Sequence, residues 1–195
     1  MLLEAKKTFT LTTPLTEEKI KKLRAGDMLY LTGVIIGARD MAHKRMIESI
    51  KKGEPLPIDL KDQTIFYAGP APTPKGKKSG SIGPTTSSRM DELTEPLIER
   101  GLKATIGKGE RSGELRKLLI RYKAIYLVAI GGVSAYLATR VKEVRKIAYH
   151  DLDAEAIYEI SVEDFPLFVA YDIYGGDIFE KVKSETQNIL SDKFQ

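Results

Sequence analysis

The sequence predicts one α/β domain that spans residues 1–195 and contains mixed strands. Apolar and β-branched runs typical of buried strands alternate with amphipathic stretches of helical spacing. Hydrophobic residues make up 42% and charged residues 30% of the 195 positions, which is typical of a soluble globular protein with a sizeable core. We find no internal repeat and no convincing linker, so we expect a single domain.

The first half of the chain supplies three expected strands and two expected helices. Residues 8–12 open the chain as a strand, and a short helix begins at Thr16 with two acidic residues in its first turn. Residues 28–36 are apolar and β-branched, so they predict a buried strand, and a helix follows it to about Lys52. Residues 64–68 predict a further short strand.

The second half alternates in the same way before a strand-rich tail. A strand over residues 102–106 precedes a helix over 113–122. A buried strand over residues 124–130 precedes a helix of small residues that Gly131 and Gly132 open and that ends at Arg140. The tail is expected to hold strands over 144–149, 157–162 and 167–172 and an amphipathic helix over 178–190.

Residues 69–80 form a connection rich in Gly and Pro that is neither helix nor central strand. It is long for a passive connection, and long loops are often functional. The alternative is a solvated surface loop with an ordinary basic tip made by Lys75, Lys77 and Lys78. Because Gly and Pro leave few internal hydrogen bonds, we expect the loop from Pro70 to Gly80 to be mobile in the isolated chain and to order in a complex.

The stretch that follows this loop passes into an amphipathic helix. Pro84 disfavours helical geometry at Gly83. Four consecutive hydroxyl residues that can each cap a helix come next, namely Thr85, Thr86, Ser87 and Ser88. We therefore expect them at a helix N-terminus, where free backbone N–H groups attract anions, with Arg89 one turn inside. This predicts a carboxylate or phosphate site, and the alternative is a plain capped helix after a glycine-rich turn.

Three expected strand ends carry the cations of this predicted site. Arg39 follows one strand, residues 85–89 follow another by way of the loop, and Lys108 stands between paired glycines after a third. Because α/β sheets place ligands where strands run into helices, this arrangement predicts a site for a small dianion. The alternative for Arg39 is a surface ion pair with Asp40 or Glu48, which would contribute little.

The composition excludes several classes of site. The chain has no cysteine and only two histidines, which excludes disulfides, thiolate catalysis, a cysteine-ligated metal or cluster, and a histidine-rich metal site within this chain. The net charge of +4 agrees with an anionic ligand but falls short of a nucleic-acid footprint. The longest nearly apolar run, about fifteen residues over 124–138, is too short for a membrane span. The N-terminus lacks the apolar core of a signal peptide, and we expect a cytoplasmic protein.

Five motifs, GARDMAHKR, YAGPAP, GSIGPTTSSRMD, IGKG and VEDFP, occur in this order between Gly37 and Pro166, and the matching stretch runs from about Gly26 to about Asp172. In order and spacing they resemble the iron–sulfur-dependent class I fumarate hydratases. The match is to the C-terminal domain of these enzymes, which in many prokaryotes is a separate β subunit. The L(+)-tartrate dehydratase β subunits are close relatives. The resemblance implies a three-layer β/β/α swivelling domain and the reversible hydration of fumarate to (S)-malate.

The resemblance also implies a role for each residue of the predicted site. Arg39 and Arg89 match arginines that hold substrate carboxylates, and Lys108 matches a substrate-binding lysine. Thr85 matches the proposed catalytic base, with a helix cap or a substrate hydrogen-bond donor as the alternative. Thr86 and Gly83 are expected to contribute to substrate binding, and Asp40, His43 and Lys44 are assigned only to the neighbourhood of the site.

A second chain is the last implication of the resemblance. In this family three cysteines of the α subunit or N-terminal domain hold a [4Fe-4S] cluster, so we expect the cluster on a partner α subunit and no metal ligand here. The expected assembly is an α2β2 heterotetramer, and the isolated chain is expected to be inactive, with a homodimer as one alternative state. Two other functions stay open: an L(+)-tartrate dehydratase β subunit, and a non-catalytic anion-binding or regulatory module with the same fold.

Overall fold

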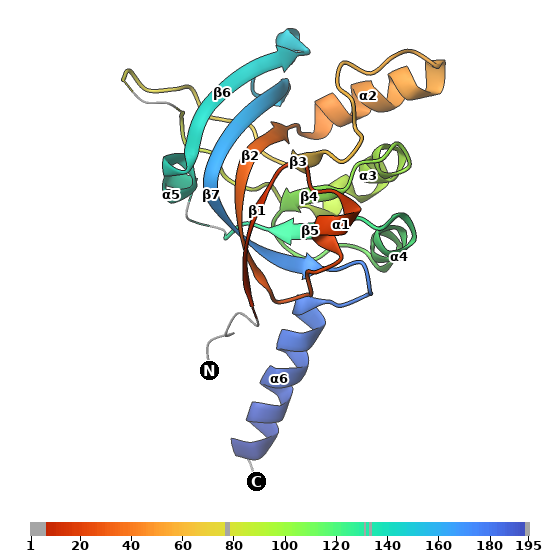
Figure 1. Ribbon diagram of the computed structural model, residues 1–195, viewed down its shortest axis with the longest axis vertical. Helices are drawn as coiled ribbons and strands as arrows, with labels where there is room; N and C mark the ends of the chain where they lie inside the picture. Colours follow the sequence, from red (N-terminus) through yellow and green to blue (C-terminus); the bar gives the residue numbers. More distant parts are fainter. Residues whose placement is uncertain (1–6, 77–78, 131, 133, 194–195) are drawn as a thin grey trace.

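The computed structural model describes residues 7–76, 79–130, 132 and 134–193, which form a mixed α/β structure (Figure 1). The strands are β1 Thr8–Thr12, β2 Met28–Gly37, β3 Thr64–Phe66, β4 Ala104–Gly107, β5 Ile125–Val128, β6 Val141–Ala148 and β7 Ile157–Tyr171. The helices are α1 Glu17–Ile20, α2 Asp40–Lys52, α3 Asp91–Ile98, α4 Gly113–Tyr122, α5 Ser134–Thr139 and α6 Ile178–Lys193, with 3₁₀ helices η1 Ser88–Met90 and η2 His150–Glu155. Residues 1–6, the start of the segment in which we expect no signal peptide, lie outside the described residues. The same holds for Lys77, Lys78 and Gly131.

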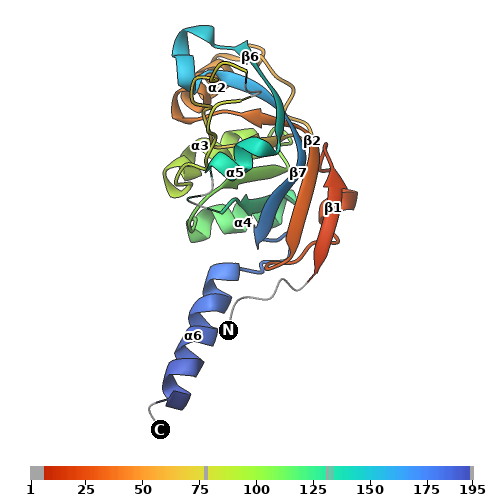
Figure 2. The ribbon, with the colours of Figure 1, turned by 90° about the vertical axis from the view of Figure 1, so that its left-hand side faces the viewer.

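The seven strands form one sheet in the order β1-β2-β3-β4-β5-β7-β6. Strands β1 to β5 pair with their neighbours in parallel, whereas β7 runs antiparallel to β5, β6 and β2. Because β2 pairs with both β3 and β7, the sheet folds back on itself into two layers. Figure 1 shows the long strands β2, β7 and β6, with β1 beside β2, on one side of the short strands β3, β4 and β5, and helices α2, α3 and α4 on the other. Figure 2 shows the same layers from the side.

Two hydrophobic cores lie on opposite faces of the short strands. Phe66 and Leu127 belong to the core shared with the long strands, whereas their neighbours Ile65 and Tyr126 belong to the core shared with the helices. This alternation follows from the period of two in a β-strand, which sends successive side chains to opposite faces. The expected α/β class is confirmed, and the two cores separate three layers in the order β/β/α.

The strand β7 differs from the prediction of two strands over 157–162 and 167–172. The structure has one continuous strand of 15 residues that crosses both layers, pairing with β6 in its first half and with β5 near its end. Asp164 adopts a positive φ of 49° and donates its N–H to the Thr32 hydroxyl at 3.0 Å. The register with β2 shifts at the same place, between Leu31 and Gly33. A β-bulge of this kind bends a strand without ending it, which explains why the VEDFP segment looked like a break.

Most other elements lie where the sequence places them, with local differences at their ends. The strand β1 and the helix α4 coincide with the predicted ranges. The strand β3 is two residues shorter than predicted, and β6 begins three residues earlier. The helix α5 begins at Ser134 rather than at the glycines, and η2 is an element that the sequence pattern did not predict.

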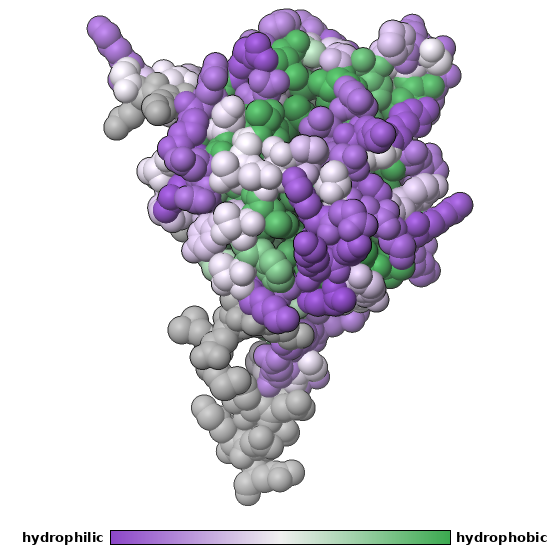
Figure 3. All heavy atoms as spheres, viewed as in Figure 1, coloured by the Kyte–Doolittle hydropathy of each residue, from purple (hydrophilic) through white to green (hydrophobic). Residues whose placement is uncertain are grey.

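The helix α6 extends away from the rest of the protein, as both ribbon views show (Figures 1 and 2). Only its start packs on the sheet, where the Phe179 ring meets the Tyr171 ring edge to face at 6.0 Å. Polar residues cover most of the face drawn in Figure 3, with apolar patches between them. Among the described residues, no helix combines the length and the apolar character that crossing a membrane requires.

Candidate functional site

The predicted site residues lie at one edge of the parallel strands. Strands β2, β3 and β4 are parallel neighbours, so their C-terminal ends meet at the same edge of the sheet. Arg39 follows β2 by two residues, and Lys108 follows β4 directly. Residues 85–89 return to the same edge after the loop that leaves β3. The structure therefore brings the three expected strand ends together, whereas the roles of their residues stay predictions.

Backbone hydrogen bonds join the segment of Thr85 to the ends of β3 and β4. The Thr85 N–H donates to the Tyr67 carbonyl at 2.8 Å, and the Thr85 carbonyl accepts the Lys108 N–H at 3.2 Å. The Ser87 N–H donates to the Lys108 carbonyl at 3.0 Å. Thr86 and Lys108 thus form a parallel bridge, and the segment continues the sheet beyond β4. Thr85 and Lys108 are held side by side by the main chain.

The four hydroxyl residues lead into a helix as expected, but the expected capping by their side chains is wrong. The first helical turn begins only at Ser88, and no side chain caps η1 or α3. Thr85 and Thr86 are not helical. The ends of β3 and β4 supply backbone hydrogen-bond partners to this segment, which therefore extends along the sheet edge. The helix-cap alternative for Thr85 falls for the same reason. Thr85 is partly exposed, and its hydroxyl makes no hydrogen bond within the described part of the chain.

The two arginines of the site share one carboxylate. Arg89 binds Asp40 in a bidentate manner, with Nε 2.9 Å from Oδ1 and Nη2 3.0 Å from Oδ2. Arg39 Nε lies 3.9 Å from Asp40 Oδ2, and Arg39 Nη2 lies 3.7 Å from Glu155 Oε1. Burial would raise the pKa of the Asp40 carboxyl, but the Arg89 hydrogen bonds and charge hold it below its usual value. Asp40 is therefore ionised at neutral pH and links both cations.

Arg39 has donor capacity that the protein leaves unused. Its Nε is buried and has no hydrogen-bond partner in the described residues, and both of its carboxylate contacts are long. Of the two partners in the expected alternative, Asp40 does pair with Arg39, whereas the described residues show no pair with Glu48, and Glu155 of η2 is the second carboxylate. Glu155 also accepts the Met41 N–H at 2.8 Å and so binds the N-terminus of α2. Sequence reasoning missed Glu155, because a distance of more than a hundred positions leaves no local pattern.

His43 lies inside the protein behind Arg39. It is fully buried, its Nδ1 lies 2.9 Å from the Arg39 carbonyl oxygen, and its ring meets the Tyr67 ring edge to face at 5.5 Å. Burial lowers the pKa of His43 from the ordinary 6.5 to about 4, so the ring is neutral at pH 7. A neutral ring that contacts a carbonyl oxygen donates from Nδ1. His43 thus supports the start of α2, whereas Lys44 is exposed to solvent.

A buried cluster around Arg111 lies beneath the site and was also missed. The Arg111 side chain is fully buried and forms an ion pair with Asp91, the first residue of α3. Its Nη2 donates to Thr94 Oγ1 at 3.1 Å, and its guanidinium lies 5.3 Å from the Tyr67 ring and 5.1 Å from the Tyr126 ring. This cluster joins α3, the β4–α4 connection and the strands that carry the site. Asp91 stands in the GSIGPTTSSRMD motif, but its partner is twenty positions away.

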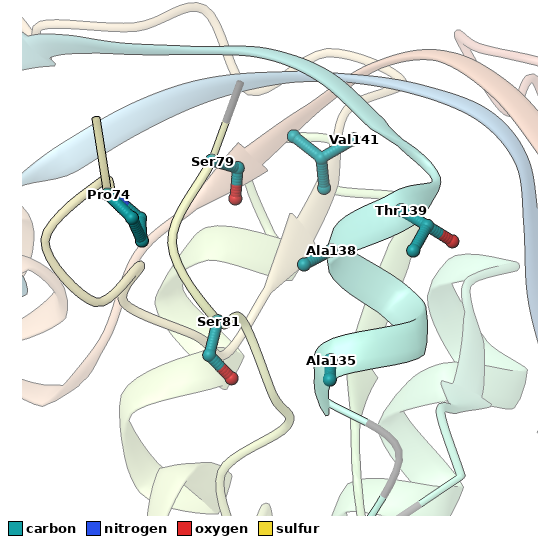
Figure 4. A pocket seen from close by; sticks show the side chains of 7 residues that line it. All are labelled: Pro74, Ser79, Ser81, Ala135, Ala138, Thr139 and Val141. Carbon is teal, nitrogen blue, oxygen red and sulfur yellow. The ribbon is translucent and has the colours of Figure 1, made fainter. Parts of the chain in front are cut away.

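Glycines let the loop approach the helices closely. A Cβ on Gly83 would lie 2.2 Å from Ser134 Oγ at the start of α5, so only glycine fits there. A groove of about 400 Å³ separates the loop from α5 (Figure 4). Its lining residues are Pro74, Ser79, Ser81, Ala135, Ala138, Thr139 and Val141. The groove holds none of the predicted site residues. The mobility of the loop stays a prediction.

No metal site accompanies these groups. The chain contains no cysteine, and the described residues include no cluster of three His, Asp or Glu side chains suited to a metal ion. The arrangement can bind an anion at exposed cationic side chains, next to a threonine hydroxyl that is free to accept or donate a proton.

Comparison with known proteins agrees with the resemblance in the motifs. The sequence model of the family described as Fumarase C-terminus matches residues 3–182. The aerobic class I fumarate hydratase of Salmonella typhimurium is 39% identical over 178 residues, which cover 89% of this chain and 31% of that enzyme. The anaerobic class I enzyme of Escherichia coli K12 is 44% identical over 156 residues, 79% of this chain and 28% of that enzyme.

A shorter relative matches along most of its length. The L(+)-tartrate dehydratase subunit beta of Escherichia coli K12 is 35% identical over 178 residues, which cover 89% of this chain and 87% of that subunit. The chain thus spans less than a third of the class I fumarate hydratases but most of a tartrate dehydratase β subunit.

Proposed function

Because the chain belongs to the Fumarase C-terminus family, we propose that it is the β subunit of a class I fumarate hydratase and catalyses the reversible hydration of fumarate to (S)-malate. One observation carries the proposal. Arg39, Arg89 and Lys108 lie at one edge of adjacent parallel strands beside Thr85, and the buried Arg39 Nε has no hydrogen-bond partner in the described residues. A four-carbon dicarboxylate has two charges to place on these three cations.

Arg89 and Arg39 are proposed to bind the substrate carboxylates. The Arg89 side chain is 47% exposed, and its guanidinium already holds one carboxylate, that of Asp40, in bidentate geometry. The buried Arg39 Nε lacks a partner, and a substrate oxygen would satisfy it. Such charge-assisted bonds are stronger and more directional than neutral ones. Asp40 would keep the two guanidinium groups in place, since it contacts both.

Thr85 is the proposed base and Lys108 the charge beside it. Removing a proton next to a carboxylate builds a doubly charged aci-carboxylate, and fixed cations stabilise that developing charge more than the ground state. A threonine hydroxyl is a weak base at neutral pH. The Lys108 ammonium and both arginines would favour its alkoxide once a partner excludes water from the edge. A substrate hydrogen-bond donor remains the alternative role of Thr85.

The residues of this chain do not fit the iron–sulfur cluster of class I fumarate hydratases. Such a cluster needs cysteine thiolates, and the sequence has none. We therefore derive no step through the cluster here. As part of the proposal, a partner α subunit holds it in an α2β2 assembly, and the name of the tartrate dehydratase relative as a subunit beta supports a second chain.

L(+)-tartrate dehydration is the second candidate activity. A specific observation favours it, because the chain covers 87% of a tartrate dehydratase β subunit but only 31% of the aerobic fumarate hydratase. Both substrates are four-carbon dicarboxylates that the same cations would bind. A non-catalytic anion-binding module with this fold is the third candidate. It predicts dicarboxylate or phosphate binding with no turnover.

The test is to purify the chain alone and with its α subunit under anaerobic conditions, and to assay fumarate hydration and L(+)-tartrate dehydration. We expect the isolated chain to be folded, colourless and inactive, and the complex to turn over fumarate faster than tartrate. Faster tartrate turnover would make the second candidate the function. Turnover by the isolated chain, or a complex inactive on both substrates, would overturn the proposal.

A further inference from the structure

One buried hydroxyl, that of Ser87, adds a side-chain contact to the backbone junction between Thr85 and Lys108, where the Lys108 N–H also donates to the Thr85 carbonyl at 3.2 Å. Ser87 is fully buried, and its Oγ accepts the Lys108 N–H at 3.1 Å. Space at this point is so limited that a Cβ on Gly107 would lie 1.8 Å from Ser87 Oγ. The Ser87 side chain therefore occupies the space between the Thr85 segment and the end of β4, and glycine at position 107 leaves room for it.

Tyr126 reaches this junction from β5. Its hydroxyl oxygen lies 3.0 Å from Ser87 Oγ and 2.8 Å from the Gly109 carbonyl oxygen. A carbonyl oxygen only accepts, so the single tyrosine hydrogen goes to Gly109. The Ser87 hydroxyl then donates to the tyrosine oxygen at 3.0 Å rather than to the Thr85 carbonyl oxygen, which lies farther away at 3.5 Å. The result is a chain from the Lys108 N–H through Ser87 and Tyr126 to the Gly109 carbonyl. It contacts the main chain on both sides of the Lys108 side chain.

The surroundings keep Tyr126 fixed and protonated. Its ring is fully buried, lies 5.5 Å from the Tyr171 ring and has the Arg111 guanidinium 5.1 Å from its centroid. Burial raises the pKa of the Tyr126 hydroxyl well above its usual value, so it keeps its hydrogen at any physiological pH. A buried hydroxyl with both partners satisfied costs little to retain, whereas phenylalanine here would leave Gly109 and Ser87 without one partner each.

We propose that Tyr126 is a positioning residue that sets, through the Ser87 hydroxyl, the place of Lys108 relative to Thr85 at the sheet edge. This inference rests on the proposed function of that edge. Tyr126 does not touch the substrate. It acts on the geometry between the two groups that do, and small misplacement of reacting groups is costly for a chemical step.

The experiment compares Tyr126→Phe with Tyr171→Phe in complexes with the wild-type α subunit. Tyr171 is a matched control, because it is equally buried and its hydroxyl accepts the backbone N–H of Arg111 at 2.9 Å, away from the junction. We expect Tyr126→Phe to lower kcat by about ten- to a hundredfold with KM within about threefold, because ground-state binding by the arginines persists. Tyr171→Phe should show a similar loss of melting temperature with kcat within about twofold of the wild type.

Ser87→Ala completes the test as a double-mutant cycle. If both residues act through the same chain of hydrogen bonds, Ser87→Ala combined with Tyr126→Phe should lower kcat no further than either change alone. Multiplied losses would overturn the proposal. So would a normal kcat for Tyr126→Phe, or an equal kcat loss for Tyr171→Phe.

A readout without turnover separates this inference from the proposed function. Amide hydrogen exchange at Lys108 in the isolated full chain should be about tenfold faster in Tyr126→Phe than in Tyr171→Phe. If the wild-type complex proves inactive on both dicarboxylates, the proposed function fails. The exchange rates then still decide whether Tyr126 fixes the Lys108 backbone, and equal rates in the two variants would overturn the inference.

Discussion

Two arginine–aspartate pairs lie close to each other in this fold and differ in almost every physical respect. Arg111 and Asp91 are 0% and 13% exposed, whereas Arg89 and Asp40 are 47% and 25% exposed. The guanidinium of Arg111 is surrounded by Thr94, Tyr67 and Tyr126 in addition to its carboxylate. Among the described residues, Arg89 forms its ion pair with Asp40 alone. The groups around the buried Arg111 hold its ion pair in place. The exposed Arg89 guanidinium can bind a second carboxylate.

Both pairs consist of an arginine and an aspartate, so residue type does not tell which one is structural and which one can bind a ligand. The burial of the pair does. Removing one partner of a buried pair leaves an uncompensated charge in a low dielectric, which costs several kcal/mol. Removing one partner of an exposed pair costs at most about 1 kcal/mol, because water takes its place. Loss of the Arg111 side chain should therefore mainly lower the stability of the protein, whereas loss of the Arg89 side chain should mainly lower its activity.

The largest expected effect comes from the buried pair. Arg111→Met should lower the free energy of unfolding by about 3–5 kcal/mol, because the Asp91 carboxylate would stay buried without its cation. Urea unfolding at pH 7 measures this loss. Arg89→Ala is the matched control and should lose less than about 1 kcal/mol. Equal losses for the two variants would show that burial does not separate the pairs.

His43 extends the comparison to titration. Its pKa is lowered to about 4 in the folded protein by burial, against 6.5 in the unfolded chain. Between these values the unfolded state binds more protons, so stability is complete above pH 6.5 and is lost as the pH falls toward 4. The expected loss is about 3 kcal/mol, measured by urea unfolding across this range. His43→Gln should flatten this dependence, and an unchanged pH profile in that variant would remove the assignment to His43.

Thr85 tests the chemistry at the exposed side. Thr85→Ala should lower kcat by at least about 10²-fold with KM little changed if the hydroxyl is the base. The melting temperature should stay near that of the wild type, because the hydroxyl makes no hydrogen bond in the described structure. Steady-state kinetics of the reconstituted complex and a thermal melt measure both. Thr86→Ala, at the exposed neighbouring position, is the control. A near-normal kcat for Thr85→Ala would leave the residue only as a hydrogen-bond donor.

The smallest expected effect concerns Asp40. The lowered pKa of its carboxyl means that its contribution to stability is present above the unfolded value of 3.8 and is lost as the pH falls below that value. Asp40→Asn should therefore cost less than about 1 kcal/mol at pH 7, and the difference from the wild type should shrink near pH 3. Chemical unfolding at several pH values tests this. A loss that grows toward low pH would contradict the assigned ion pair.

The sequence predicted those features that local patterns determine. The helix α4 coincides with the predicted range 113–122, and the structure shows the local cap that starts it, because the Ser112 hydroxyl accepts the Leu115 N–H at 3.2 Å. The sequence predicts Arg39 and Lys108 at one site because α/β sheets place ligands where strands run into helices, and the parallel strands β2, β3 and β4 do bring their ends to one edge. The family resemblance in the motifs was confirmed by the comparison with known proteins.

What the sequence could not supply depends on distant partners. The hydroxyl row on its own predicts a helix cap, because the competing backbone bonds come from Tyr67 and Lys108, which follow the strands β3 and β4. The strand β7 looked interrupted because the bulge at Asp164 is satisfied by Thr32, more than a hundred positions away. Ser87 and Tyr126 meet only once β5 lies beside β4. No window of neighbouring residues contains these contacts.

The most direct test of the central claim is kcat/KM of the complex that carries Arg89→Ala, compared with Arg100→Ala, an exposed arginine at the other end of α3. The account predicts that Arg89→Ala lowers kcat/KM for the dicarboxylate by about one to two decades, the value of a charge-assisted hydrogen bond of roughly 1.5–3 kcal/mol. Arg100→Ala should stay within about twofold of the wild type. An unchanged kcat/KM for Arg89→Ala would contradict the anion site at the sheet edge.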